Sequence, residues 1–233
     1  MAGMRVVVLT GAGISAESGV RTFRDSGGLW EDHHIEDVAT PEGFARDRDL
    51  VQRFYDARRS AVAAAQPNAA HRALARLEEA LGEDLLVVTQ NVDDLHERAG
   101  SRNVVHMHGE LLRARCEACG RRHRWTAGLL DSPPCPTCSE PALRPDVVWF
   151  GEIPYELERI DRAVSGCDLF VSIGTSGAVY PAAGYVALAA SSGARTLELN
   201  LETSEVSRFF DEVRSGPAAQ LVPQWVAELI GDN

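Results

Sequence analysis

The chain has 233 residues, of which 45% are hydrophobic and 24% charged, a composition typical of soluble globular proteins. Its net charge of -11 argues against a nucleic-acid partner, which would require a basic face. No apolar run approaches the roughly 18 residues of a membrane span, and the apolar start is too short for a secretory signal. We therefore expect a cytoplasmic protein without membrane contact and without regulatory tails. All 23 basic residues are arginine, which excludes Schiff-base chemistry and a P-loop lysine.

Short β-branched or aliphatic runs recur along the chain, and each ends in small or polar residues. The runs are Arg5–Thr10, Leu85–Thr89, Asn103–Met107, Leu169–Ile173 and Thr196–Leu199. Helical patterns, such as His71–Leu81 and Tyr155–Val164, lie between several of them. This alternation predicts an α/β fold with a Rossmann-like parallel sheet and helices on both faces. Ligands bind such sheets beyond the carboxyl ends of the strands, where the polar residues of this chain gather.

The first of these loops indicates a nucleotide site. The sequence Gly11-x-Gly13-x-x-Ala16 follows a strand and has the G-x-G-x-x-A form of the dinucleotide fingerprint. Its glycines would let the backbone approach a pyrophosphate, and a following helix would offer free N–H groups. No second strand ends in an acidic residue about 20 positions later, as a dehydrogenase would require. Residues 24–34 read instead as a loop, so we expect a nucleotide bound in another way.

The cysteines predict a structural metal site. Cys116-x-x-Cys119 and Cys135-x-x-Cys138 are separated by 15 residues, the spacing of a zinc ribbon with four thiolates in a closed shell. Disulfides or an iron–sulfur cluster are the alternatives. The intervening stretch is too irregular to bury a core, so one structural zinc per chain would take the place of that core. Cys167 lies outside the pattern and is expected to be a buried hydrophobic residue.

Two histidines and two polar residues stand near predicted strand ends. His106 and His108 lie two residues apart, facing the same side of a strand, and could chelate a metal. His108 stands at a strand end where it could be a general base that reaches a bound ribose, or could be inert, and His106 is expected to face the core or a neighbouring helix. Asn91 and Asp93 could hydrogen-bond an amide and a hydroxyl, or could form an Asx-turn.

Long motifs in the chain resemble those of sirtuins. They are GAGISAESGVRTFRD at 11–25, TQNVDDLH at 89–96, HGE at 108–110, VVWFGE at 147–152 and GTS at 174–176. The resemblance covers nearly the whole chain and is particularly strong to bacterial CobB-type enzymes. YDARR at 55–59 resembles the branch that removes acidic acyl groups such as succinyl and malonyl.

The resemblance implies a set of site residues. His108 would be the general base, with Asn91 and Asp93 in the nicotinamide and ribose pocket and Phe23 shielding the reactive face. Val148, Phe150 and Gly151 would flank an acyl-lysine tunnel. Tyr55 and Arg58 would receive the acyl carboxylate. The residues expected to hold NAD are Gly11, Ala12, Gly13, Ser15, Glu17, Thr22, Phe23, Arg24, Gln90, Asn91, Asp93, Gly174, Thr175, Ser176, Asn200, Leu201, Glu202 and Ala218.

The implied reaction is an NAD-dependent deacylation of lysine in acylated proteins or peptides. It would yield nicotinamide, free lysine and 2′-O-acyl-ADP-ribose, without a protein nucleophile. The implied organisation is one catalytic domain over residues 1–233, plausibly a monomer, with a helical insert at about 31–66 and a zinc-binding insert at about 111–143.

Three alternatives remain open at this level. A mono-ADP-ribosyltransferase on the same fold would use the same Asn91, Asp93 and His108. A non-catalytic zinc-ribbon module would leave the polar strand ends unexplained. The stretch Leu50–Ala65 reads as a helix, on which Tyr55 and Arg58 could also be a surface pair with a purely structural role.

Overall fold

A parallel sheet forms the centre of the molecule in the computed structural model, which describes residues 3–20, 29–30 and 33–231. Its six strands have the order β11-β10-β9-β1-β4-β5. In chain order they are β1 (Val6–Thr10), β4 (Leu85–Thr89), β5 (Val104–His106), β9 (Leu169–Ile173), β10 (Arg195–Asn200) and β11 (Glu212–Ser215). Thr10 lies opposite both Thr89 and Ile173, so three neighbouring strands end at one level. The predicted parallel α/β sheet is confirmed.

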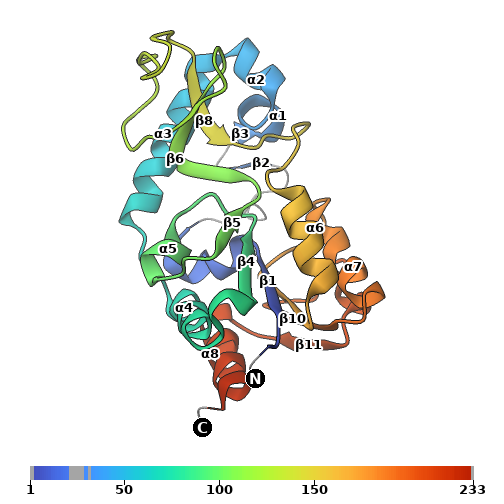
Figure 1. The fold of residues 1–233 in the computed structure, drawn as a ribbon. Helices are drawn as coiled ribbons and strands as arrows, with labels where there is room; N and C mark the ends of the chain where they lie inside the picture. The colour runs from blue at the N-terminus through green and yellow to red at the C-terminus, as the bar shows by residue number, and fades with distance from the viewer. Residues whose placement is uncertain (1–2, 21–28, 31–32, 232–233) are drawn as a thin grey trace.

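Helices cover both faces of this sheet because its strands are apolar on both sides. Val6 and Val8 pack in one cluster with α4 (Ala69–Leu81) and α8 (Ala218–Ile230). Val7 and Leu9, which alternate with them, pack against α6 (Leu157–Gly166) and α7 (Tyr185–Ser191). Figure 1 shows the two helix pairs on opposite sides of the strands.

A second group of elements lies at the other end of the molecule (Figure 1). It contains the helices α1 (Ile35–Val38), α2 (Pro41–Arg46) and α3 (Arg48–Ala64), and the antiparallel strands β6 (Gly109–Cys116), β7 (Arg122–Arg124) and β8 (Leu143–Val147). A separate apolar cluster, with Trp149 among its largest buried side chains, joins the helices to β6 and the end of β8. The description of these segments as inserts in one domain stays a prediction.

Helix α3 packs on β6 and β8 of the second group, and its last turn accepts a hydrogen bond from Arg98 of α5 (Leu95–Ala99). Its start is capped by Asp47, whose Oδ1 accepts a hydrogen bond from Leu50 N at 2.9 Å. Its buried residues include Tyr55, Arg58 and Val62, which recur at helical spacing along one face. The predicted helix over Leu50–Ala65 is therefore correct to within two residues at each end.

Local structure near the first loop differs from the sequence prediction. The residues after β1 form two 3-10 turns, Ala12–Ile14 and Ala16–Ser18, and not the expected α-helix. Gly19, at a φ of 81°, ends the second turn in the left-handed region. Leu29–Trp30 (β2) and His33–His34 (β3) form a short antiparallel pair in the segment expected to be a loop. Within the described ranges, no helix combines the length and the apolar character needed to cross a membrane.

Candidate functional site

One large cavity lies beyond the carboxyl ends of the central strands. Its volume is about 970 Å³, and it reaches from the β1 loop to α3 and the segment after β8. Every described residue that the sequence predicted to contact NAD or substrate lines it, although these residues come from segments far apart in the chain. Thr22, Phe23 and Arg24 lie outside the described residues.

Three glycines bring the two loops of the nucleotide side together. The backbone N–H of Gly13 donates to the carbonyl oxygen of Gly174 at 2.8 Å. A Cβ at Gly13 would lie 2.6 Å from the Gly174 Cα, and one at Gly11 would lie 2.8 Å from the Gly174 oxygen. Gly174 itself has a φ of +61°. The glycines of the fingerprint thus allow the two loops to contact each other closely. The sequence prediction invoked only a pyrophosphate and did not include this contact.

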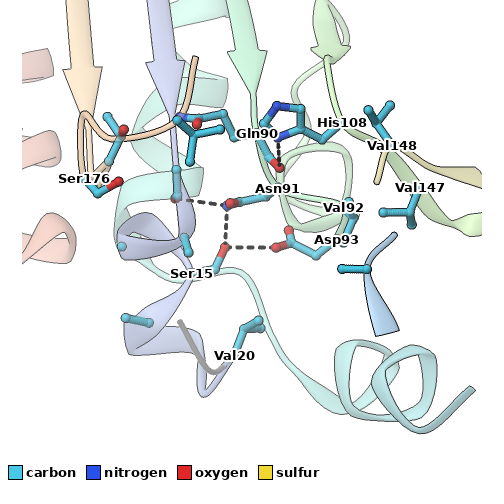
Figure 2. Close-up of a pocket in the computed structure, with 18 of the residues that line it drawn as sticks. Ser15, Val20, Gln90, Asn91, Val92, Asp93, His108, Val147, Val148 and Ser176 are labelled. Atoms are coloured by element: carbon cyan, nitrogen blue, oxygen red, sulfur yellow. Dashed lines mark hydrogen bonds between the residues drawn. The ribbon is translucent and has the colours of Figure 1, made fainter. Parts of the chain in front are cut away.

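The Ser15 hydroxyl organises the polar centre of the cavity (Figure 2). It donates to Asp93 Oδ2 at 3.1 Å and accepts from Asn91 Nδ2 at 3.2 Å. Asn91 Nδ2 also donates to the Gly11 carbonyl at 3.1 Å. The Asp93 Oδ1 atom accepts from Leu95 N at 3.1 Å, so the Asx-turn interpretation holds for Asp93 together with the contact to Ser15.

A buried histidine that the sequence analysis did not single out completes this network. His71 lies beneath Ser15, with Nε2 at 3.4 Å from the hydroxyl. Its Nδ1 accepts from Asn68 N at 3.3 Å, so Nε2 carries the ring proton and donates to Ser15. Burial lowers the pKa of His71 to about 4, which keeps this ring neutral near pH 7. With both acceptor positions of Ser15 occupied, its single proton goes to Asp93.

His108 has the geometry of a neutral base. It lies in the turn after β5, and its Nδ1 is 3.2 Å from the Gln90 carbonyl oxygen (Figure 2). A carbonyl only accepts, so Nδ1 carries the proton and Nε2 keeps its lone pair. Burial lowers the pKa of His108, while the hydrogen bond to Gln90 opposes this change. The expectation that His106 and His108 face one side of a strand is wrong, because β5 ends at His106.

Tyr55 and Arg58 lie inside the molecule, since their exposed fractions are 0% and 6%. The interpretation of these residues as a surface pair is therefore wrong. The indole Nε1 of Trp149 donates to the Tyr55 hydroxyl at 3.0 Å. Burial raises the pKa of Tyr55, and this phenol stays protonated near neutral pH. Both side chains line the cavity at its α3 wall.

The segment after β8 is held rigidly beside the α3 wall, next to Tyr55. Glu152 accepts hydrogen bonds from Arg144 at 2.7 Å and from the backbone N of Trp149 at 2.9 Å. The Arg144 guanidinium also lies 3.5 Å from the centre of the Trp149 ring, a cation–π contact. Val148 N donates to the His108 carbonyl oxygen at 2.8 Å, which ties this segment to the base. Phe150, 45% exposed, lies where the cavity opens.

The four paired cysteines converge at the far end of the second group. The Sγ atoms of Cys116, Cys119, Cys135 and Cys138 all lie within 4.8 Å of one another, and none forms a disulfide. The two knuckles have the same backbone pattern: Gly120 N donates to Cys116 O at 2.9 Å, and Ser139 N donates to Cys135 O at 2.8 Å. Four soft thiols at these distances fit one tetrahedral zinc ion, and this set leaves no open coordination position.

The surroundings of the cysteines differ in one respect from the prediction. The stretch between the knuckles supplies Leu129, which is fully buried with Ala114 and Leu143 in a small apolar cluster. The module therefore has a modest core of its own beside the metal ligands. Cys167 is buried at the end of α6, as expected, and donates to Val164 O at 3.2 Å. Burial raises the pKa of its thiol.

Several residues that line the cavity were not predicted. Trp149 and Val62 were accessible to sequence reasoning, because one lies within a quoted motif and the other is one helical turn after Arg58. Residues outside the quoted motifs and α3 come from segments whose proximity has no local signal. They include Ala39, Val179, Tyr180 and Pro217.

Comparisons with known proteins agree with this geometry. The model of the Sir2 family matches residues 11–181. An NAD-dependent protein deacylase of Pasteurella multocida is 57% identical over 230 residues, covering 97% of this chain and 98% of that protein. The NAD-dependent protein deacylase of Escherichia coli strain K12 is 58% identical over 229 residues, covering 97% and 82%. A crystal structure of a Sir2 homologue in complex with NAD has a TM-score of 0.88 at 40% identity, covering 97% of this chain and 89% of that one.

Proposed function

As a member of the Sir2 family the chain is an NAD-dependent protein deacylase, and we propose that it removes acidic acyl groups, succinyl and malonyl, as well as acetyl groups from lysine side chains. One observation carries the acyl preference. A buried tyrosine and a buried arginine, Tyr55 and Arg58, line the same cavity as the nucleotide loops and His108. Acylated proteins or peptides are the proposed partners, and a cytoplasmic location stays a prediction.

The cavity has the size and the small-residue loops that NAD requires. Small residues of the loops after β1 and β9 line a volume of about 970 Å³, enough for a dinucleotide and a side chain. Ala12, Gln90, Ser176, Asn200 and Ala218 would hold its ADP-ribose part. NAD supplies the ADP-ribosyl acceptor of the acyl group, with nicotinamide as the leaving group.

The residues of the chain would orient the substrates and supply one general base. The Ser15 network fixes the Asn91 amide and the Asp93 carboxylate beside the expected nicotinamide ribose. His108 Nε2, with its lone pair, would accept a proton from a ribose hydroxyl, and the product would be 2′-O-acyl-ADP-ribose. No side-chain nucleophile is needed, because the amide oxygen of the acyl-lysine would itself be the nucleophile, and the cavity would supply its orientation.

The acyl preference follows from the chemistry of Arg58. A guanidinium offers a planar donor fork that matches a carboxylate, and a buried position strengthens such a contact. A charged hydrogen bond contributes roughly 1.5–3 kcal/mol, which corresponds to about a 10- to 150-fold preference for an acidic acyl group. Because the interaction is present in the bound substrate, the preference should appear mainly in KM.

The test is a comparison of acyl-lysine peptides with the double variant Tyr55→Phe, Arg58→Met. Wild-type protein should process succinyl-lysine with a higher kcat/KM than acetyl-lysine, and the variant should lose this advantage while keeping acetyl activity. Arg53→Met, an exposed substitution on the same helix, is the matched control and should change neither rate. Equal losses of both activities in the double variant would mean that Tyr55 and Arg58 are structural.

The alternative of a mono-ADP-ribosyltransferase makes no use of the acyl side of the cavity. Mass spectrometry of the same reactions separates the two activities. Deacylation removes the mass of the acyl group from the peptide, whereas transfer adds an ADP-ribosyl group to the acceptor protein.

A further inference from the structure

Two histidines hold two consecutive carbonyl groups of the loop that carries Asn91. His108 contacts the carbonyl oxygen of Gln90, and His106 Nδ1 lies 3.0 Å from the carbonyl oxygen of Asn91. On its other side, His106 Nε2 lies 2.8 Å from Oε1 of Glu97 on α5. The His106 side chain is only 8% exposed, so water does not easily replace either partner.

Both partners of His106 are acceptors. A backbone carbonyl and a carboxylate can only accept, and a neutral imidazole has a single N–H to donate. In a neutral ring, one nitrogen would therefore turn its lone pair toward an oxygen at about hydrogen-bond distance, which is repulsive. The imidazolium form has two N–H groups and satisfies both contacts. His108 differs, because in its contacts with the described residues only Nδ1 faces a carbonyl oxygen.

The charged groups around His106 favour the same form. Burial alone would lower its pKa, but the hydrogen bond and charge of Glu97, the Asn91 carbonyl and the charge of Glu110 on β6 together raise it. Asp93 is a further acidic neighbour, and the His106 charge lowers the pKa of that carboxyl against the effect of its burial. Among the described residues, His96 on α5 is also coupled to His106 and would oppose its charge if protonated, but complete burial holds the pKa of His96 well below the ordinary value, so it stays neutral.

We propose that His106 is a positively charged positioning residue, which clamps the Asn91 carbonyl and sets the alkaline limb of the deacylation pH profile. The inference rests on the proposed role of Asn91 in the nicotinamide pocket. As the pH rises through the titration of His106, one ring nitrogen loses its proton and one of the two contacts is lost. The Asn91 loop then loosens, and its amide no longer holds its position between Gly11 and Ser15.

The protonation state can be measured without any assay of activity. In protein labelled with ¹⁵N in the histidine rings, NMR at pH 6.5 should show His106 mainly protonated at both nitrogens and His108 mainly protonated at one nitrogen. The His106 signals are assigned by their loss in His106→Gln. Titration should place the His106 pKa above the ordinary value of 6.5, and Glu97→Gln should lower it. A His106 pKa at or below the ordinary value of 6.5 would overturn the proposal.

The kinetic test uses an acetyl-lysine peptide, so that it does not depend on the acyl preference. The alkaline limb of kcat/KM should move to lower pH by about one unit in Glu97→Gln, and should disappear in His106→Gln at a cost of up to about tenfold in rate. His34→Gln, which alters an exposed histidine on β3, is the control and should keep the wild-type profile. Glu97 is half-exposed, so its variant should fold even if His106→Gln does not.

The outcomes separate this inference from the proposed function. A doubly protonated His106 with an alkaline limb unmoved in both variants would overturn the positioning role and leave the acyl preference intact. Failure of the Tyr55 and Arg58 experiment, in contrast, would leave the acetyl-peptide profiles and the ring titration unchanged.

Discussion

Histidines near the nucleotide side of the cavity differ in charge, some neutral and one positive, although they are close together. Burial lowers the pKa values of His71, His96 and His108. His106 is buried as well, but its acidic partner Glu97 reverses the direction of the pKa shift. Figure 2 shows His108 beside Gln90 and Asn91 at the edge of the polar network. The partner of each ring, and not burial alone, decides whether it can serve as a base or as a fixed charge.

Replacing His108 by alanine should abolish deacylation while leaving the fold intact. Loss of a positioned general base costs about 10²–10⁴-fold in rate. In the wild-type protein the base works only when neutral. Because its pKa is lowered, activity should persist as the pH falls to the ordinary histidine value of 6.5 and should be lost below it. Steady-state kinetics against pH, with circular dichroism of the variant, provide the measurement. Near-normal turnover in a folded His108→Ala protein would contradict the assignment.

At the level of elements, the cavity depends on how closely two loops approach each other. The 3-10 turns after β1 contact the residues after β9 through backbone atoms, as the 2.8 Å hydrogen bond from Gly13 to Gly174 shows. Side chains at these positions would push the loops apart. The two loops can approach this closely only because these positions are glycines, which have no side chain. A substitution there should therefore lower the stability of the fold and weaken NAD binding together.

The substitution Gly13→Ala should lower the free energy of unfolding by about 1–3 kcal/mol and raise the KM for NAD, because its Cβ would lie 2.6 Å from the Gly174 Cα. Gly184→Ala is the matched control. Its Cβ would meet only ring atoms of Tyr180, at 3.7 and 3.9 Å, and it should be neutral or stabilise by about 0.4–1 kcal/mol. Chemical denaturation and NAD saturation curves measure both effects. Equal behaviour of the two variants would refute the close-packing argument.

At the scale of the whole molecule, hydrogen bonds connect the cysteine module to α3, which forms the acyl side of the cavity. Gln52 Nε2 donates to the Leu143 carbonyl at 3.0 Å, next to the second knuckle. Leu129 N donates to the carboxylate of Asp56 at 2.9 Å. Both partners are on α3, the helix that carries Tyr55 and Arg58. Loss of order in the module should therefore weaken acyl recognition more than it disturbs the NAD loops.

The variant Cys135→Ser should reduce the zinc content below one ion per chain and lower the Tm of the module, because metal binding is coupled to its folding. In this variant the KM for the acylated peptide should rise more than the KM for NAD. Cys167→Ser changes the cysteine outside the cluster and should keep the full zinc content. Elemental analysis and differential scanning calorimetry provide the readouts. Iron in place of zinc, or no metal in carefully purified protein, would contradict the assignment.

The sequence by itself determined five of the six central strands, the four cysteines of the metal site and the family. Leu85–Thr89 and Leu169–Ile173 were predicted with the bounds that the structure has, because a buried parallel strand needs a continuous apolar run. The two Cys-x-x-Cys pairs depend on spacing within a single turn. The resemblance to sirtuins, which rested on continuous motifs, is confirmed by the family match over residues 11–181.

Only the tertiary structure decided the contacts between distant segments. Trp149 and Tyr55 are 94 residues apart, and Ser15 and His71 are 56 apart, yet each pair shares a hydrogen bond. The 3-10 turns replaced the expected helix because the loop packs against Gly174, and Gly174 lies far along the chain. Apolar periodicity and cysteine spacing are properties of a few neighbouring residues, so they predict individual helices, strands and cysteine knuckles. The partner that gives a buried side chain its charge or its orientation is fixed only when the packed layers bring remote loops to one edge of the sheet.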